Sequence, residues 1–312
     1  MAPTSTPDST ATTSSATASA ELVAPYGTGA GATAQSTAPK STHAIPGTAP
    51  KVRTHHLRAA KEAGEKFAML TAYDQYTAQI FDEAGIEVLL IGDSASNNVL
   101  GNETSLPITL DEMIIFSRAV TAGAKRALIV ADLPFGSYEQ SPEQAIASSV
   151  RLMKEGLVHA VKMEGGAYYA PTVKALTQAG IPVMAHIGFT PQSEHTLGGY
   201  RVQGRGELAQ TLIDDAVALE EAGVFCVLME MVPATTAAAI DAAISVPTVG
   251  IGAGKETTGQ VLVWQDMAGL RTGKMAKFVK QYAQMRTVLA DAATEFADEV
   301  RSGTFPGPEH TF

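Results

Sequence analysis

The sequence has little cysteine, and this scarcity limits the kind of protein it can encode. Cys226 is the only cysteine in 312 residues, so no disulfide can form within the chain. It lies inside the apolar run FCVLME without an activating neighbour in sequence, which favours core packing over a nucleophilic role. The fold must therefore rely on its core. A chain of this kind suits a reducing compartment, and we expect a cytoplasmic protein.

Charged residues are also scarce, and acidic residues outnumber basic ones. They make up 17% of the chain, with a formal net charge of −10. A general nucleic-acid surface needs clustered Lys and Arg to neutralise phosphates, so the composition argues against that class. No apolar run approaches the roughly 18 to 20 residues of a membrane helix. We expect no nucleic-acid or membrane partner, and small-molecule chemistry is favoured.

The first fifty residues lack the patterns of a folded segment. Residues 1–50 are dominated by Ala, Thr, Ser and Pro, and they contain no Lys or Arg before Lys40. Their composition predicts a disordered tail. A secretory signal or a mitochondrial presequence would need basic residues that are missing here. We therefore expect one catalytic domain over residues 51–312.

The rest of the chain alternates short apolar runs with stretches of helix length. The helical stretches carry start signals, such as Thr109 with Glu112 three residues later and Ser141 followed by Pro142. The last stretch, residues 277–302, reads as long helical segments. The eight apolar runs cover residues 67–72, 87–92, 127–131, 159–163, 182–186, 224–229, 247–251 and 261–264.

Eight strands that alternate with helices predict a (β/α)8 TIM barrel. Strands joined by right-handed helical crossovers form a parallel sheet, and eight such units close into a barrel. An open doubly wound sheet is the competing architecture. A dinucleotide-binding sheet of that kind should show a GxGxxG pattern after its first strand, and LTAYDQYTAQ does not. The barrel is therefore favoured.

Five successive apolar runs end on polar or ionisable residues. In a barrel the carboxyl ends of all strands meet at one face, where barrel enzymes build their sites. Any one of these residues alone is better explained as the cap of the next helix, but five in a row favour a shared site. Lys162 and Glu164 also share one face of their strand. The residues are Asp93, Asp132, Lys162 with Glu164, His186 and Glu230.

Three carboxylates converging on one site indicate a divalent cation. Asp93, Asp132 and Glu164 would repel one another unless a positive charge lay between them. Oxygen ligands without a cysteine cluster or an HExxH pattern fit Mg²⁺ better than Zn²⁺. Lys162 adds a second positive charge suited to an anionic oxygen. The set is typical of a site for a 2-oxo acid, which can chelate the metal.

A base is needed to remove a proton next to the polarised carbonyl. Glu230 is flanked by Met229 and Met231, and apolar surroundings raise the pKa of a carboxyl group toward neutrality. An ordinary ion pair between Glu230 and Lys162 is the alternative. His186 is open to two interpretations, a contact of the substrate oxygen or a structural histidine. Two glycine-rich stretches, residues 188–206 and 250–260, suggest a loop that shapes the site and either a phosphate loop or a tight turn.

Motifs spread over nearly all of residues 51–312 resemble the ketopantoate hydroxymethyltransferases, the 3-methyl-2-oxobutanoate hydroxymethyltransferases of pantothenate biosynthesis. Their order and spacing carry the resemblance, since single pieces such as GIGAG would prove nothing. The motifs are MLTAYD, IGDS, LPIT, ADLPF, VKMEGG, HIGFTPQS, GGYRVQGR, LMEMVP, PTVGIGAG and FPGPEHTF.

The resemblance implies a barrel of the phosphoenolpyruvate/pyruvate-binding type that uses Mg²⁺ and 5,10-methylenetetrahydrofolate. By motif, Asp93, Asp132 and Glu164 resemble the metal ligands of the family. Ser94, with Asp93, Asp132 and Lys162, resembles its 2-oxo acid contacts, to which we add His186. Glu230 stands in the position of its catalytic base. The resemblance also implies a large homo-oligomer, commonly decameric.

The expected reaction is transfer of a hydroxymethyl group from the folate to 3-methyl-2-oxobutanoate, which gives 2-dehydropantoate. Two alternatives stay open at this point. One is a Mg²⁺-dependent lyase or mutase of the same barrel type, which would turn over without folate. The other is a non-catalytic barrel that binds the oxo acid without exchanging its C3 proton.

Overall fold

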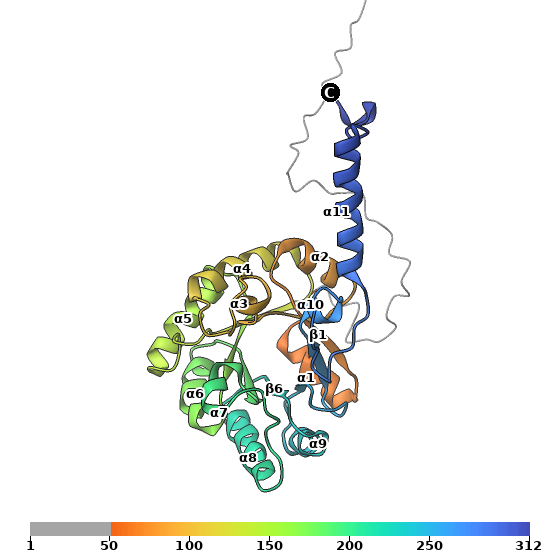
Figure 1. Ribbon diagram of the computed structural model, residues 1–312. Helices are drawn as coiled ribbons and strands as arrows, with labels where there is room; N and C mark the ends of the chain where they lie inside the picture. Colours follow the sequence, from red (N-terminus) through yellow and green to blue (C-terminus); the bar gives the residue numbers. More distant parts are fainter. Residues whose placement is uncertain (1–50) are drawn as a thin grey trace, which may run out of the picture. The chain divides into compact units, whose positions relative to one another are not determined.

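Eight parallel strands form a closed barrel in which each strand pairs with its neighbours in sequence. The computed structural model describes residues 51–312, and the predicted tail at residues 1–50 lies outside them. Figure 1 shows helices arranged around the strands. The strands are β1 (Phe67–Thr71), β2 (Val88–Ile91), β3 (Leu128–Asp132), β4 (Ala160–Glu164), β5 (Val183–Gly188), β6 (Cys226–Glu230), β7 (Thr248–Ile251) and β8 (Gly259–Leu262).

The predicted barrel is confirmed, and each predicted run overlaps a strand. The last one is displaced, because β8 begins at Gly259 where the sequence suggested residue 261. Gly259 already pairs with Phe67 of β1. At the other end, the backbone N–H of Trp264 donates to Thr71 Oγ1 at 3.0 Å. This bond ties the first residue of α10 to the last residue of β1.

The helices lie between successive strands as the βα rhythm predicts. Short helices follow β2, β5 and β8, and the last helix follows the barrel. The α-helices are α1 (Thr54–Ala63), α2 (Gln75–Glu83), α3 (Ala95–Asn98), α4 (Leu110–Gly123), α5 (Pro142–Lys154), α6 (Ala170–Gln178), α7 (Glu194–Leu197), α8 (Leu208–Glu221), α9 (Ala234–Ala243), α10 (Trp264–Met267) and α11 (Met285–Ser302).

Both predicted helix starts are found. Thr109 Oγ1 accepts from the backbone N–H of Glu112 at 3.2 Å, and the Glu112 carboxylate accepts from the backbone N–H of Thr109 at 2.8 Å. This is the reciprocal pair of a capping box at α4. Ser141 caps α5 by accepting from the backbone N–H of Gln144 at 3.2 Å. Local side-chain chemistry therefore determines where these two helices begin.

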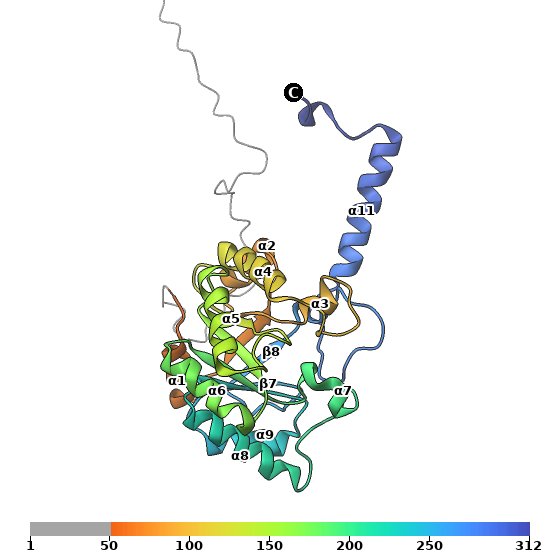
Figure 2. The same cartoon turned by 90° about the vertical axis from the view of Figure 1, so that its left-hand side faces the viewer.

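The N-terminal end of the barrel is closed by α1. Its residues Leu57 and Ala60 belong to the same buried cluster as the barrel-lining Met69 and Leu90. In Figure 2, α1 lies at one end of the barrel, and α3 and α7 lie at the other. Cys226 is fully buried in this cluster, and burial raises the pKa of its thiol. The packing role predicted for it is confirmed.

The segment after α10 differs from the prediction. Residues 277–284 are not helical, and α11 begins only at Met285. The backbone N–H of Tyr282 donates to the carbonyl of Met267 at 2.8 Å, so this stretch is held against α10 in an irregular conformation. None of the residues of α11 is buried. No helix within residues 51–312 has the length and apolar character needed to cross a membrane.

Candidate active site

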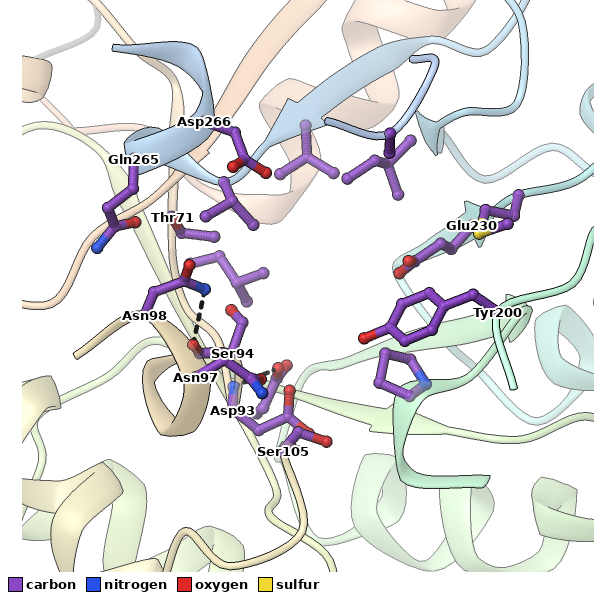
Figure 3. A pocket seen from close by; sticks show the side chains of 18 of the residues that line it. Thr71, Asp93, Ser94, Asn97, Asn98, Ser105, Tyr200, Glu230, Gln265 and Asp266 are labelled. Carbon is purple, nitrogen blue, oxygen red and sulfur yellow. Dashed lines mark hydrogen bonds between the residues drawn. The ribbon is translucent and has the colours of Figure 1, made fainter. Parts of the chain in front are cut away.

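A cavity of about 900 Å³ opens at the carboxyl ends of the strands. Figure 3 shows side chains from several elements that point into it. The cavity lies at the end of the barrel opposite α1, as the parallel strands require. The side chains predicted from the strand ends all line it: Asp93, Ser94, Asp132, Lys162, Glu164, His186 and Glu230.

The turn after β2 brings Asp93 and Ser94 to the floor of the cavity. The backbone N–H of Asp93 donates to Asp132 Oδ2 at 2.9 Å, which joins the ends of β2 and β3. The Ser94 hydroxyl lies 2.8 Å from the Tyr73 hydroxyl. Asn98 Nδ2 donates to the Ser94 carbonyl at 2.9 Å, as Figure 3 shows. These bonds hold the turn so that both side chains face the cavity.

Lys162 is the one cation placed among these buried carboxylates in the described residues. Its Nζ lies 2.8 Å from Asp132 Oδ1, and both side chains are at most 4% exposed. Asp132 Oδ1 shares this ion pair but accepts no well-aligned hydrogen bond within residues 51–312. The contact is therefore held by charge, and the ammonium keeps donors available for another oxygen.

His186 lies between Lys162 and Glu230 and is held neutral. Burial and the nearby ammonium of Lys162 lower the pKa of the imidazole well below its usual range. Lys162 Nζ lies 3.3 Å from His186 Nδ1. An ammonium can only donate, so in this contact Nδ1 accepts and the ring proton sits on Nε2. Glu164 Oε1 also lies 3.3 Å from Nδ1 and then receives no hydrogen from the ring. Nε2 lies 3.6 Å from Glu230 Oε2, and the N–H therefore faces the carboxyl group of Glu230.

Burial raises the pKa of the carboxyl groups in this site. The pKa of Asp93 and that of Asp132 are each raised to about 6, and that of Glu164 to about 7. Loss of solvation is the largest cause in each case, while Lys162 acts in the opposite direction. Four carboxyl groups, with Glu230, face one ammonium and a neutral imidazole. The site therefore has an excess of acidic groups for which its own residues supply too little positive charge.

Glu230 has the strongest shift of the four. Burial and then Glu164 raise its pKa to about 8. Its side chain is still 15% exposed toward the cavity, so it can meet a ligand. The alternative, an ion pair between Glu230 and Lys162, is not found among residues 51–312. There the ionisable side chain paired with Glu230 is His186. This is the environment of a carboxyl group that takes up a proton near neutral pH.

The acidic excess suits a divalent cation, although the ligands are not gathered around one point. As they stand, no three His, Cys, Asp or Glu side chains in residues 51–312 form a ready-made metal site. Mg²⁺ does not need such a cage, because it commonly binds through one or two carboxylates and keeps several waters. Glu164 Oε1 has no hydrogen-bond partner in the described residues. Asp93, Asp132 and Glu164 therefore fit a hydrated cation by charge and donor chemistry.

Gln192 is a site residue that the sequence reasoning missed. Its Nε2 donates to Asp93 Oδ2 and to the carbonyl of Leu133, both at 3.0 Å, and its backbone N–H donates to Glu164 Oε2 at 3.0 Å. Its Oε1 accepts from the Tyr138 hydroxyl at 2.5 Å. One residue thus orients two carboxylates from different strands. The available signals were its place in the glycine-rich stretch after β5 and in the motif HIGFTPQS.

The same glycine-rich stretch also reaches the cavity further along. Pro191 and Tyr200 line it, and Figure 3 shows the Tyr200 ring beside Glu230. The Tyr200 ring packs on Phe189 with centroids 4.6 Å apart. The loop predicted to shape the site thus contributes walls to it.

Comparison with known proteins gives one consistent result. The family model described as ketopantoate hydroxymethyltransferase matches residues 51–308. The 3-methyl-2-oxobutanoate hydroxymethyltransferase of Paenarthrobacter aurescens (strain TC1) is 70% identical over 312 residues, which cover 100% of both chains. The protein of the same name from Arthrobacter sp. (strain FB24) is 72% identical over 296 residues, which cover 94% of this chain and 96% of the relative.

Solved structures are similar in fold at low sequence identity. A phosphonopyruvate hydrolase in complex with oxalate and Mg²⁺ has a TM-score of 0.55 at 14% identity, covering 83% of this chain and 93% of that chain. A 2,3-dimethylmalate lyase of the PEP mutase/isocitrate lyase superfamily has a TM-score of 0.53 at 15% identity, covering 83% and 89%. These likenesses bear on the fold alone, and they agree with the predicted (β/α)8 barrel.

Proposed function

The chain belongs to the ketopantoate hydroxymethyltransferase family, and from this premise we propose which reaction it catalyses and with which residues. The substrate is 3-methyl-2-oxobutanoate, and the product is 2-dehydropantoate, a precursor of pantothenate. The hydroxymethyl carbon comes from 5,10-methylenetetrahydrofolate, which leaves as tetrahydrofolate. We place this chemistry in the cytoplasm, since the single buried thiol suits a reducing compartment.

The observation that carries the proposal is the setting of Glu230. Its carboxyl group faces the cavity, has no cationic partner in the described residues and has its pKa raised to about 8. Removal of the C3 proton of the oxo acid requires a base of this kind. Glu230 takes that proton, and the resulting carbon nucleophile forms the new C–C bond to the methylene carbon, whose bonds to N5 and N10 of the folate break. Water supplies the hydroxyl oxygen, and the two folate nitrogens take up one proton of the water and the proton removed from C3.

The acidic floor of the cavity holds the oxo acid. Asp93, Asp132 and Glu164 would bind Mg²⁺, and bound Mg²⁺ would polarise the keto oxygen and so acidify the adjacent C–H. Ser94 and Lys162 lie on the same floor and donate hydrogen bonds to the substrate carboxylate and keto oxygen. Because Ser94 and Lys162 bind the oxygen atoms of the substrate, its C3 atom is free to face Glu230.

His186 supports the base through its tautomer. Because Lys162 fixes Nδ1 as an acceptor, the Nε2–H faces Glu230 and can stabilise the ionised carboxylate without competing for the proton. We therefore assign it a positioning role beside the substrate.

The direct test is formation of 2-dehydropantoate from 3-methyl-2-oxobutanoate with 5,10-methylenetetrahydrofolate and Mg²⁺. We expect turnover that depends on both. Turnover without folate would favour the lyase or mutase alternative. Binding of the oxo acid without C3 proton exchange would favour the non-catalytic one. A folded sample with no activity would refute the assignment.

We also propose that the protein is a homo-oligomer. Large apolar side chains of α11 are exposed, among them Val288, Leu289, Phe296 and Val300, at 48–58%. A helix with such a face gains stability when another surface covers it. Light scattering after gel filtration should give a mass well above that of one chain. A Phe296→Ser variant should lower that mass, and a monomeric wild-type protein would contradict the proposal.

A further inference from the structure

The cavity has a second side that the oxo acid site leaves unused. The acidic residues come from the arc of strands β2 to β6. The opposite arc contributes the apolar Ile251 of β7, Val261 of β8 and Val263, which directly follows β8, to the lining. Cavities of about 300 to 1,000 Å³ accommodate drug-sized ligands, so about 900 Å³ exceeds the need of a five-carbon acid. The apolar arc therefore has room for a second reactant.

Two buried polar side chains stand at the edge of this apolar wall without hydrogen-bond partners. Gln265 and Asp266 are each 6% exposed, and both line the cavity from α10. Within residues 51–312, Gln265 Oε1 and Asp266 Oδ1 accept no hydrogen bond. Figure 3 shows both side chains across the cavity from Glu230 and Tyr200. Buried polar groups without partners are costly, so such a pair indicates a ligand or ordered water.

The nearest charge does not satisfy Asp266. Arg271 Nη1 lies 3.6 Å from Asp266 Oδ1, and the Arg271 side chain is 55% exposed. This distance is beyond a hydrogen bond, and an exposed ion pair of this kind contributes little to stability. The carboxylate can therefore accept hydrogen bonds from a molecule in the cavity after a small adjustment of its side chain.

The chemistry of the two side chains selects one reactant. A carboxylate offers two acceptors, and the neighbouring amide offers a donor and an acceptor. The pyrimidine edge of a pterin presents the complement, with two adjacent N–H donor groups next to a carbonyl oxygen. Its flat ring system suits an apolar wall. The 2-oxo acid has no N–H group, so it cannot supply these donors.

We propose that α10 and the β7–β8 side of the cavity form the pterin subsite for the folate donor. Asp266 accepts hydrogen bonds from the N3–H and one N–H of the 2-amino group, and the unpartnered Gln265 Oε1 accepts the second N–H of the 2-amino group. The ring packs on Val261 and Val263. This inference rests on the proposed function, because it assigns a place to the second substrate of that reaction.

The single tryptophan of the chain supplies a local probe. Trp264 is the first residue of α10, directly before Gln265. Tetrahydrofolate added to the full-length protein should change Trp264 fluorescence, after correction for absorption by the ligand. Calorimetric titration with tetrahydrofolate provides a dissociation constant that does not depend on optical effects. The C3 deuterium exchange of 3-methyl-2-oxobutanoate without folate reports separately on the acidic arc.

The Asp266→Asn variant should raise the dissociation constant for tetrahydrofolate about 10- to 100-fold, the usual effect of losing hydrogen bonds to a charged group. Folate-free exchange should stay within about twofold of wild type, since the acidic arc is intact. Asp214→Asn, at an exposed site on α8, is the matched control and should change neither quantity. Gln265→Leu should also weaken tetrahydrofolate binding, and it keeps the test decisive if Asp266→Asn does not fold.

Unchanged tetrahydrofolate affinity in both variants would overturn the subsite and would indicate that ordered water partners the two side chains. Loss of both C3 proton exchange and tetrahydrofolate affinity in the variants would also overturn it, because Gln265 and Asp266 would then maintain the whole cavity and not the folate subsite alone. A wild-type protein that neither exchanges the C3 proton nor transfers the carbon would instead refute the proposed function.

Discussion

Replacement of Glu230 by glutamine should stop proton removal without preventing binding of the oxo acid. The amide keeps the shape of the side chain but cannot take up the C3 proton. A positioned base contributes about 100- to 10,000-fold to proton transfer, so exchange of that proton should fall by this factor in Glu230→Gln. The neighbouring His186 cannot take over, because its Nε2 already carries the ring proton and its pKa is lowered.

The raised pKa of Glu230 also predicts how proton exchange by the wild-type protein depends on pH. Glu230 has its pKa raised from the ordinary 4.5 to about 8, and a carboxyl group with a pKa of about 8 is only about one-tenth ionised at pH 7. Exchange should therefore increase about tenfold per pH unit below the pKa and then level off. A bound cation favours the ionised form, so with Mg²⁺ the midpoint should lie below 8 and above 4.5.

Proton NMR in deuterium oxide measures the exchange, and calorimetry measures binding of 3-methyl-2-oxobutanoate. Glu221→Gln, at an exposed position on α8, is the matched control and should behave as wild type. Exchange in Glu230→Gln within about tenfold of the wild-type rate would assign the base role to another residue. Loss of oxo acid binding in the variant would show that Glu230 acts in binding instead.

Three further perturbations test the surroundings of the base. Gln192→Leu removes the hydrogen bond to Asp93 and should weaken Mg²⁺ binding about 10- to 100-fold by calorimetry. Tyr138→Phe should have a smaller effect, and equal affinity in wild type and Gln192→Leu would contradict this. Gly188→Ala should lower the melting temperature and the exchange rate, because Gly188 has a φ of +91° and an added Cβ would clash with the Glu230 carbonyl; wild-type values for both would refute the argument. The four acidic groups have folded pKa values above their ordinary ones, so their stabilising effect is complete below about pH 4 and is lost as the pH rises toward 8. Mg²⁺ should therefore raise the melting temperature more at pH 8 than at pH 5 in scanning calorimetry, and equal shifts would be inconsistent with this origin.

The membership of the acidic site could be predicted because it follows from periodicity and topology. Asp93, Asp132 and Glu230 directly follow or end apolar runs of strand length, and parallel strands carry their last residues to one face. The alternation along β4 likewise places Lys162 and Glu164 together. These deductions need no knowledge of side-chain contacts. Residues at the strand ends could therefore be predicted to share one cavity, and the structure places them there.

Residues positioned by loops could not be predicted in this way. Gln192 meets Asp93 and Glu164 because the chain turns back after β5, and no short-range pattern specifies that turn. The predicted helix over residues 277–284 failed for a similar reason, since a backbone bond from Tyr282 to Met267 replaces helical pairing. In both cases long-range contacts decide a local conformation that propensity alone leaves open.

The electrostatic state of the site lies between these two cases. The sequence shows how many charged residues the site contains, and from their number we predicted a divalent cation. It does not show how deeply these residues are buried. The structure adds that Lys162 pairs with Asp132 and that His186 is neutral, so the charge of Lys162 offsets the raised pKa of Glu230 only in part. Burial raises the pKa of Glu230 more than that of the other three carboxyl groups, and Glu230 is the residue that we propose as the base. The same excess of buried carboxyl groups therefore supports both proposals, a cation bound by Asp93, Asp132 and Glu164 and a proton acceptor at Glu230.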